Sequence, residues 1–405
     1  MHVAAMEPLL PSDPQLDDLA VSLLQEAGAL GAAIPDPTRL GLAGLLRMVN
    51  CYYSNRIEGH DTRPADIERA MHAEYASDSP IRALQREARA HVEVQELMEG
   101  WLSSDPALDI GSAAFLCRIH REFYDRVPDE FRFVEDAGRK TKVPVVPGEL
   151  RDREVVVGRH RPPESADLEK FLRRFDEAYD PGDLGRVTQV VAMAASHHRL
   201  MWIHPFLDGN GRVTRLFSHA YAIRAGIGGL GLWSASRGLA RRRSDYLAAL
   251  DAADAPRSHD LDGRGQLSVA ALREFTTFFL EVCLDQVIYM RQTLQLDKLG
   301  ERIVGYAALR ARGNALRPPL PTGGEGAPSF RESSGLLLRE VMLRGEVARG
   351  EAARVLGLGE RVARSTVSSL VAEGLLVSPT SRSPLRLGFP THAVGYWLPG
   401  LYPEG

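Results

Sequence analysis

The stretch HPFLDGNGRVTR, residues 204–215, decides how the rest of this 405-residue sequence is interpreted. It follows a segment with helical periodicity, residues 186–203, and opens a second one, residues 212–225. Residues 208–211 are therefore expected to form a tight loop at the N-terminus of a helix. Such a loop presents unpaired backbone amides and the positive end of the helix dipole, which together attract anions. The sequence thus predicts a phosphate site at this point.

Glycines and arginines of this stretch support that prediction. Gly209 and Gly211 let a phosphate approach the backbone closely, and Asn210 between them tolerates a positive φ. Arg212 and Arg215 are three residues apart, so both lie on one face of the first helical turn. Cations are unfavourable at a helix N-terminus, so a bound polyanion is the natural reason for two of them.

Two further side chains suit metal-assisted proton transfer. Asp208 offers a hard oxygen ligand for Mg²⁺ where the phosphates are expected. His204, with an ordinary pKa of about 6.5, can take a hydroxyl proton at neutral pH. A lone Gly-x-Gly is weak evidence, and a lone His is more often structural. This stretch combines a base, a carboxylate, a glycine cradle and two arginines within twelve residues. A purely structural role is therefore a poor explanation for it. Phe206 is expected to point inward and anchor the loop.

The stretch resembles the signature of the Fic family, His-x-Phe-x-Asp/Glu-Gly-Asn-Gly-Arg-x-x-Arg, with every fixed position filled. The likeness extends over residues 9–295. It implies that His204 deprotonates a target hydroxyl and that Asp208 holds Mg²⁺ between the α- and β-phosphates of ATP. It also implies that residues 209–211 form the anion hole, and that Arg212 and Arg215 grip the β- and γ-phosphates.

A second segment breaks the helical pattern. Residues 140–160 contain prolines and a β-branched run, which predicts a β-hairpin, and a surface hairpin without function is the alternative. The run VVVGRHRPP, residues 155–163, is similar to the family's flap, which covers the nucleotide and pins the target backbone by strand addition. The resemblance assigns nucleotide contacts there to four residues: Val157, Gly158, Arg159 and His160. Tyr246 and Asp254 stand where family members have an adenine-contacting Tyr and Asn, and the Asp leaves that last contact open.

The motif SNRIEG, residues 54–59, lies far upstream. Taken alone it is an ordinary helix end, with Gly59 just after the last turn. Beside the Fic-like signature it resembles the inhibitory motif Ser/Thr-x-x-x-Glu-Gly/Asn, matched here by Ser54, Glu58 and Gly59. The resemblance implies that Glu58 pairs with Arg215 and occupies the arginine that should hold the γ-phosphate.

The composition is that of an ordinary globular protein, with 44% hydrophobic and 25% charged residues. A net charge of −4 provides no global attraction to nucleic acid or to anionic membranes. Three widely spaced cysteines fit neither a disulfide framework nor a zinc site. The N-terminus does not look like a signal peptide, and no stretch of about 18 apolar residues occurs. We expect a cytoplasmic protein without a membrane span.

Periodicity predicts helices in most of the chain and four regions. These are an N-terminal helical region with the inhibitory helix (1–110), a Fic catalytic core (111–312), a Pro/Gly/Ser-rich linker (313–334) and a winged-helix domain (335–405). Helices expected at 335–344, 350–356 and 361–373, followed by the strand-like LRLGF, are in the order of a winged helix-turn-helix. Between residues 331 and 386 nine Arg face six Glu, a small excess for strong DNA affinity. DNA binding, protein binding and dimerisation all remain open for this domain.

The expected fold is mainly α: a Fic-type helical bundle with one β-hairpin flap, plus a C-terminal winged helix-turn-helix. The resemblance implies a protein adenylyltransferase (AMPylase) that transfers AMP from ATP, with Mg²⁺, to a Ser, Thr or Tyr hydroxyl of a protein target and is autoinhibited by Glu58. Self-modification and a homodimer are compatible with this function. Neither the target nor the oligomeric state follows from the sequence. Two alternatives stay open: a Fic enzyme that transfers UMP or phosphate or removes AMP, and a nucleotide-sensing transcription regulator.

Overall fold

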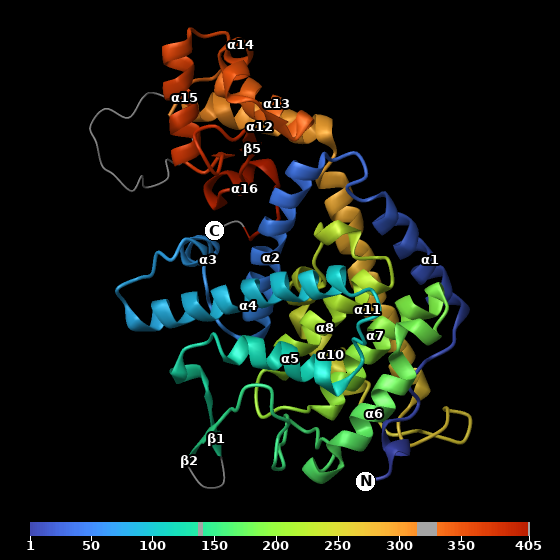
Figure 1. Ribbon diagram of the computed structural model, residues 1–405. Coiled ribbons are helices and arrows are strands. Elements are labelled where there is room, and N and C mark those ends of the chain that lie inside the picture. Colours follow the sequence, from blue (N-terminus) through green and yellow to red (C-terminus); the bar gives the residue numbers. More distant parts are fainter. Residues whose placement is uncertain (137–140, 314–329, 404–405) are drawn as a thin grey trace. The chain divides into compact units, whose positions relative to one another are not determined.

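The computed structural model describes residues 1–136, 141–313 and 330–403. They form sixteen α-helices and two small antiparallel sheets, which confirms the mainly helical fold (Figure 1). The predicted linker, 313–334, falls largely on residues 314–329, which lie outside the described ranges. The boundaries at residues 110 and 334 remain predictions. The chain divides into two compact units: unit 1 is Met1–Gly28, Asn50–Gly229 and Trp233–Ile288, and unit 2 is Ala29–Val49, Leu230–Leu232 and Tyr289–Gly405.

Unit 1 is a helical bundle with one hairpin. Its helices are α3 (Pro64–Met71), α4 (Ser79–Ser104), α5 (Ala113–Tyr124), α6 (Leu168–Tyr179), α7 (Arg186–Ile203), α8 (Asn210–Arg224), α9 (Ala235–Arg241) and α10 (Arg243–Ala252). The helices α1 (Pro14–Ala29), α2 (Asp36–Glu58) and α11 (Val269–Thr293) contribute residues to both units.

The core of unit 1 is built around α7 and α8, which lie side by side (Figure 1). Nearly every residue of α7 from Val190 to Ile203 is buried, as expected for a helix covered on all sides. On one side it contacts α6, whose apolar residues recur three or four apart and form a single buried stripe. On its other side α8 contacts α5 and α4. The segment between α7 and α8 is therefore held by two packed helices.

The hairpin lies upstream of its predicted position. Strands β1 (Phe133–Asp136) and β2 (Thr141–Pro144) pair antiparallel, so the prediction of one hairpin over residues 140–160 is wrong. The run at residues 155–157 forms no strand and makes a single bridge, Val157 with His160. Val143 in β2 is buried, whereas Val156 is exposed, because no neighbouring strand covers the later run. β-Branched residues alone indicated extended backbone correctly but not a ladder.

Helical periodicity runs without interruption over residues 269–312 and predicts one helical segment there. The structure has two helices instead, α11 and α12 (Leu296–Ala311), because Gln295 adopts an extended ψ of 117° and starts a new helix. The apolar periodicity continues across this break, so the pattern alone gave no stop signal.

Unit 2 combines helices with a three-stranded sheet. Its C-terminal elements are α12, α13 (Ser334–Arg344), β3 (Glu346–Val347), α14 (Ala352–Leu356), α15 (Glu360–Ala372), β4 (Leu376–Val377), β5 (Leu385–Leu387) and α16 (Thr391–Trp397). The strands are ordered β3-β5-β4 and are antiparallel. Helix α12 packs against α13 and α16, and α14 against α15. The three predicted helices are confirmed to within two residues, while β3 and α16 were not predicted.

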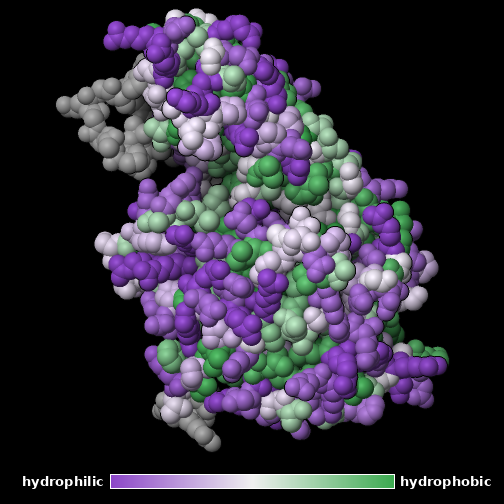
Figure 2. Space-filling model, in the orientation of Figure 1, coloured by the Kyte–Doolittle hydropathy of each residue, from purple (hydrophilic) through white to green (hydrophobic). Residues whose placement is uncertain are grey.

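Within the described ranges, no helix is long and apolar enough to cross a membrane. The face of the protein in Figure 2 is mostly hydrophilic, with hydrophobic residues in small areas between polar ones.

Candidate active site

The loop between α7 and α8 is fixed by its own side chains. His204 ends α7 in the left-handed region, with φ 49° and ψ 62°, and Gly209 precedes α8 with φ 77°. Asn210, which could tolerate a positive φ, does not adopt one, because it is the first residue of α8. Its side chain instead accepts a hydrogen bond from the Phe206 amide (2.9 Å) and donates one to the Phe206 carbonyl (2.8 Å). Phe206 is buried as predicted and stacks on His120, with ring centroids 4.1 Å apart.

The start of α8 forms an anion cradle. The first helical hydrogen bond after the loop runs from the Val213 amide to the Gly209 carbonyl (2.9 Å), so the amides of residues 210–212 are those that a helix start leaves unsatisfied. A side chain at Gly209 would meet the Tyr124 ring at 2.8 Å, and one at Gly211 would collide with Glu58 Oε1. The Glu58 carboxylate thus lies against the backbone where a phosphate is expected.

Glu58 and Ser54 together hold Arg215. Glu58 is the last residue of α2, and Gly59 follows with φ 88°. Arg215 forms an ion pair with Glu58, and its Nε donates to Ser54 Oγ at 2.9 Å. Burial raises the pKa of the Glu58 carboxyl, but the charges of Arg215 and Arg212 outweigh it and lower the pKa below its ordinary value. A lowered carboxyl pKa keeps Glu58 ionised at neutral pH, so the ion pair is lost only as the pH falls through that value.

Arg212 has a different carboxylate partner, which the sequence analysis missed. It forms a buried ion pair with Glu87 of α4, and its Nη2 lies 3.4 Å from Asp208 Oδ2. The Tyr124 hydroxyl donates to the same Asp208 oxygen at 2.7 Å. Within the described part of the chain, the buried Nε of Arg212 has no hydrogen-bond partner. Arg212 therefore keeps one donor that no described protein group satisfies.

His204 is held in the state that a base requires. Its Nδ1 lies 3.3 Å from the Met201 carbonyl, an acceptor that favours the tautomer with the proton on Nδ1 and Nε2 free. Burial lowers the pKa of His204 to about 4, and the nearby His160 and Arg151 act in the same direction. Arg151 also holds the loop backbone, because its Nε donates to the His204 carbonyl at 2.9 Å.

The predicted flap residues are anchored to α7 and to the end of α10. Gly158, with φ 59°, turns the chain between Val157 and His160. One nitrogen of His160 lies 2.7 Å from the Trp202 carbonyl and the other 3.3 Å from Asp254 Oδ2. Arg159, the residue before His160, forms an ion pair with Asp251 of α10. Asp254 thus connects the flap turn to the bundle, and it also lies 3.1 Å from His198 Nε2.

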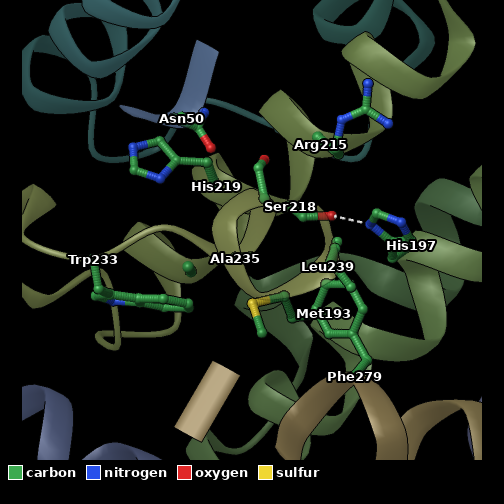
Figure 3. A pocket seen from close by; sticks show the side chains of 12 residues that line it. Asn50, Met193, His197, Arg215, Ser218, His219, Trp233, Ala235, Leu239 and Phe279 are labelled. Atoms are coloured by element: carbon green, nitrogen blue, oxygen red, sulfur yellow. Dashed lines mark hydrogen bonds between the residues drawn. The ribbon is translucent and has the colours of Figure 1, made fainter. Parts of the chain in front are cut away.

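Tyr246 lies behind Arg215 in a buried position. Its hydroxyl is 2.7 Å from His197 Nε2, and His197 Nδ1 is 2.7 Å from Ser218 Oγ. Figure 3 shows His197, Ser218 and Arg215 around the small pocket on this side of α8. Tyr246 is therefore part of the hydrogen-bonded support of α8.

The side chains present fit a nucleotide-bound Mg²⁺ and no metal held by protein alone. The described residues contain no group of three or more His, Cys, Asp or Glu side chains that could hold a metal ion. Asp208 is a single carboxylate at the cradle, fixed by Tyr124. Mg²⁺ in phosphate sites takes one or two carboxylates and completes its shell with phosphate oxygens and water.

In this helical bundle, the loop and helix start between α7 and α8 carry a His, an acidic residue, glycines and arginines. This is the arrangement expected from the Fic-like signature at residues 204–215. The Fic/DOC family profile matches residues 109–222, a shorter range than the expected likeness over 9–295. The chain therefore contains a Fic/DOC family domain, which confirms the resemblance stated from residues 204–215.

The similar proteins agree with this assignment. The chain is 39% identical over 83 residues to proteins named protein adenylyltransferase Fic from Drosophila erecta and Drosophila yakuba; the match covers 20% of this chain and 17% of each relative's length. A Fic family protein from Desulfovibrio desulfuricans G20 superposes with a TM-score of 0.53 at 17% identity, covering 94% of this chain and 98% of that one. A Fic domain containing signaling protein from Bacteroides thetaiotaomicron has a TM-score of 0.50 at 16% identity, covering 68% and 96%. These two structures show the shared fold.

Proposed function

We propose that the protein is a protein adenylyltransferase that moves AMP from ATP to a hydroxyl of a protein target and is inhibited by its own Glu58. The observation that carries the proposal is that His204 ends α7 in the loop that leads into α8, whose first turns carry the free amides, Arg212 and Arg215. A cradle with two arginines suits a triphosphate tail, and a neutral imidazole beside it suits a hydroxyl nucleophile. The names of the Drosophila relatives support the same reaction.

In the proposed reaction the target oxygen attacks the α-phosphorus of ATP. The bond from that phosphorus to the β-phosphate oxygen breaks, pyrophosphate leaves, and the hydroxyl proton passes to His204 Nε2. Arg212 and Arg215 bind the β- and γ-phosphates and so hold the leaving group in line. His197 contacts Ser218 of α8 and the Tyr246 hydroxyl, and these hydrogen bonds help to keep the arrangement rigid.

Asp208 would hold Mg²⁺ at this site. When bound, the ion neutralises phosphate charge on the leaving group. Tyr124 keeps the carboxylate pointed at the cradle, because its hydroxyl donates to Asp208.

Mass spectrometry tests this function directly. The purified Glu58→Gly protein is incubated with an equal mixture of ATP and UTP in the presence of Mg²⁺, alone and with a host lysate. Addition of the mass of AMP to a Ser, Thr or Tyr supports the proposal. Addition of UMP or phosphate, or loss of AMP from a previously modified protein, would assign a different reaction to the same cradle.

The pKa of His204 predicts the pH dependence of transfer. A base acts in its neutral form, so a pKa lowered to about 4 keeps His204 active at mildly acidic pH. At saturating ATP, the transfer rate of Glu58→Gly is expected to be nearly flat from about pH 8 to pH 5.5. An unshifted imidazole would instead lose about tenfold in rate near pH 5.5. Such a loss, with circular dichroism showing an intact fold, would contradict the lowered pKa.

A specific observation also favours a DNA-binding role for unit 2. We propose that α14, α15 and the β4–β5 pair form a winged helix-turn-helix. Helix α15 buries Ala363, Val367 and Leu370 and presents an opposite face that is exposed and carries Arg361, Arg364, Ser365 and Ser368. Arginine and serine on one exposed helix face suit contacts to phosphates and base edges.

The DNA role predicts an electrophoretic shift. The whole protein is titrated against random-sequence duplexes at low salt, and Arg361→Ala/Arg364→Ala is expected to weaken binding by about tenfold or more. Arg69→Ala, which removes an exposed arginine of α3, is the matched control. Binding that both variants keep, or that the parent lacks, would exclude this face as a DNA-binding surface.

A further inference from the structure

Two ion pairs join carboxylates to the arginines of the cradle, and they differ in burial. The side chain of Glu58 is 32% exposed and stands at the end of α2. The side chain of Glu87 is 0% exposed and lies in the first half of α4, with buried residues before and after it. Both arginines are buried, so the two pairs differ in the carboxylate: Glu58 can turn from the end of α2 toward solvent, whereas Glu87 is enclosed.

Both oxygens of Glu87 are used. Oε1 pairs with Nη1 of Arg212, and Oε2 lies 2.8 Å from Nδ1 of His60. His60 directly follows Gly59 and is itself partly exposed. The hydrogen bond to Glu87 raises the pKa of His60. A raised pKa favours the protonated imidazole, which is the form that attracts the Glu87 carboxylate.

The pair orients Arg212 toward the cradle. Glu87 engages Nη1, which leaves Nη2 3.4 Å from Asp208 and 3.5 Å from the Tyr124 hydroxyl. The Nε is buried and without a partner in the described part of the chain. Glu87 thus leaves Nη2 beside Asp208, where the phosphates of ATP would lie.

We propose that Glu87 is a positioning residue that keeps Arg212 fixed in its phosphate-binding orientation, with ATP bound or absent. Glu58 is the carboxylate that gives way, whereas Glu87 stays. Without Arg212 the Glu87 carboxylate would be a charge with no exposed surface, which carries a large penalty, whereas Glu58 can turn toward solvent while a phosphate takes its place on Arg215. Arg212 is long and flexible, and a fixed guanidinium spends less conformational entropy on binding a phosphate. This inference rests on the proposed function, because it takes Arg212 as a phosphate ligand.

Simple charge counting predicts the opposite effect. Glu87 carries a negative charge close to a site for a polyanion, so its removal alone would strengthen the binding of ATP. Neutralising Glu87 with an isosteric amide therefore separates the two roles by the sign of the change in affinity.

The experiment measures ATP and AMP affinity by calorimetry in the Glu58→Gly protein. We expect Glu87→Gln in this background to weaken ATP about tenfold or more and to change AMP by less than about twofold, because AMP lacks the phosphates that Arg212 binds. Glu96→Gln, an exposed glutamate of the same helix, is the matched control and should leave both affinities unchanged. Tighter ATP binding in Glu87→Gln would overturn the proposal and make Glu87 a second inhibitory carboxylate. Equal weakening of ATP and AMP would also overturn it, because a general loss of structure affects both.

A double-mutant cycle tests whether Glu87 acts on ATP binding through Arg212. If Glu87 acts through Arg212, Glu87→Gln should have no further effect on ATP affinity once Arg212→Gln is present. The double variant also removes both buried charges, so it keeps the comparison valid if Glu87→Gln alone does not fold. Additive losses would contradict the proposal. The readout is ATP affinity and not AMP transfer, so a protein that binds ATP but transfers no AMP would disprove the proposed function and leave this test intact.

Discussion

Replacing Glu58 with glycine is expected to raise AMP labelling, of the protein itself or of its target, by at least about tenfold. In the structure the Glu58 carboxylate pairs with Arg215 and lies against Gly211, so it occupies both the arginine and the backbone that a phosphate needs. A charge-assisted pair of this kind competes well with a phosphate oxygen. Displacing the reacting phosphorus by about 1 Å can cost on the order of 10²-fold in rate, so relief of this competition should be large.

Two variants show whether the increase comes from this contact. Asp61→Gly removes an exposed carboxylate three residues further along and should leave labelling at the parental level. Arg215→Ala added to Glu58→Gly should lower labelling again, because the γ-phosphate then has no arginine. If Glu58→Gly folds, binds ATP and labels no faster than the parent, residues 54–59 are an ordinary helix end and the inhibitory assignment fails.

Replacing His204 with alanine in the Glu58→Gly background is expected to reduce transfer by about 10²- to 10⁴-fold. In the proposed reaction His204, at the end of α7, takes the hydroxyl proton, whereas α8 and its arginines bind the phosphates. ATP affinity should therefore stay within about threefold of that of Glu58→Gly. His259→Ala, in the loop after α10, is a control for the loss of an imidazole elsewhere. A variant that labels as fast as its background would show that another group is the base.

Much of the site was predictable because it is local. Residues 204–215 carry the proposed base, the proposed metal ligand, the glycines and the arginines in one loop and the start of one helix, so spacing alone places them together. The contact between Glu58 and Arg215 is not local, and it was expected only because residues 54–59 resemble an inhibitory motif. The structure brings these two side chains together across 157 residues of sequence.

Glu87 and Tyr124 could not be identified in the same way. Neither belongs to a motif, and each reaches the site from its own helix through packing against α8. One signal was available for Glu87: it lies four residues after Ala83 and seven before Val94, on the buried face of α4. A carboxylate at such a position requires a buried cation, although the sequence does not say which arginine supplies it.

The hairpin over residues 140–160 was mispredicted for a related reason. Whether an extended run becomes a strand depends on a neighbouring strand, and residues 155–157 have only the single bridge to His160. Pro162 and Pro163 lack backbone N–H groups, so the return arm cannot extend the ladder. Gly158, with φ 59°, makes the turn between Val157 and His160.

One measurement tests the central claim most directly. The Glu58→Gly protein and its His204→Ala derivative are incubated with Mg²⁺ and ATP that is radiolabelled either at the α-phosphate or at the γ-phosphate, and protein-bound label is counted. AMP transfer predicts label from α-labelled ATP only, and its loss in the His204→Ala derivative. Label from γ-labelled ATP, or no protein-bound label from either nucleotide in a folded protein that binds ATP, would contradict AMP transfer at this site.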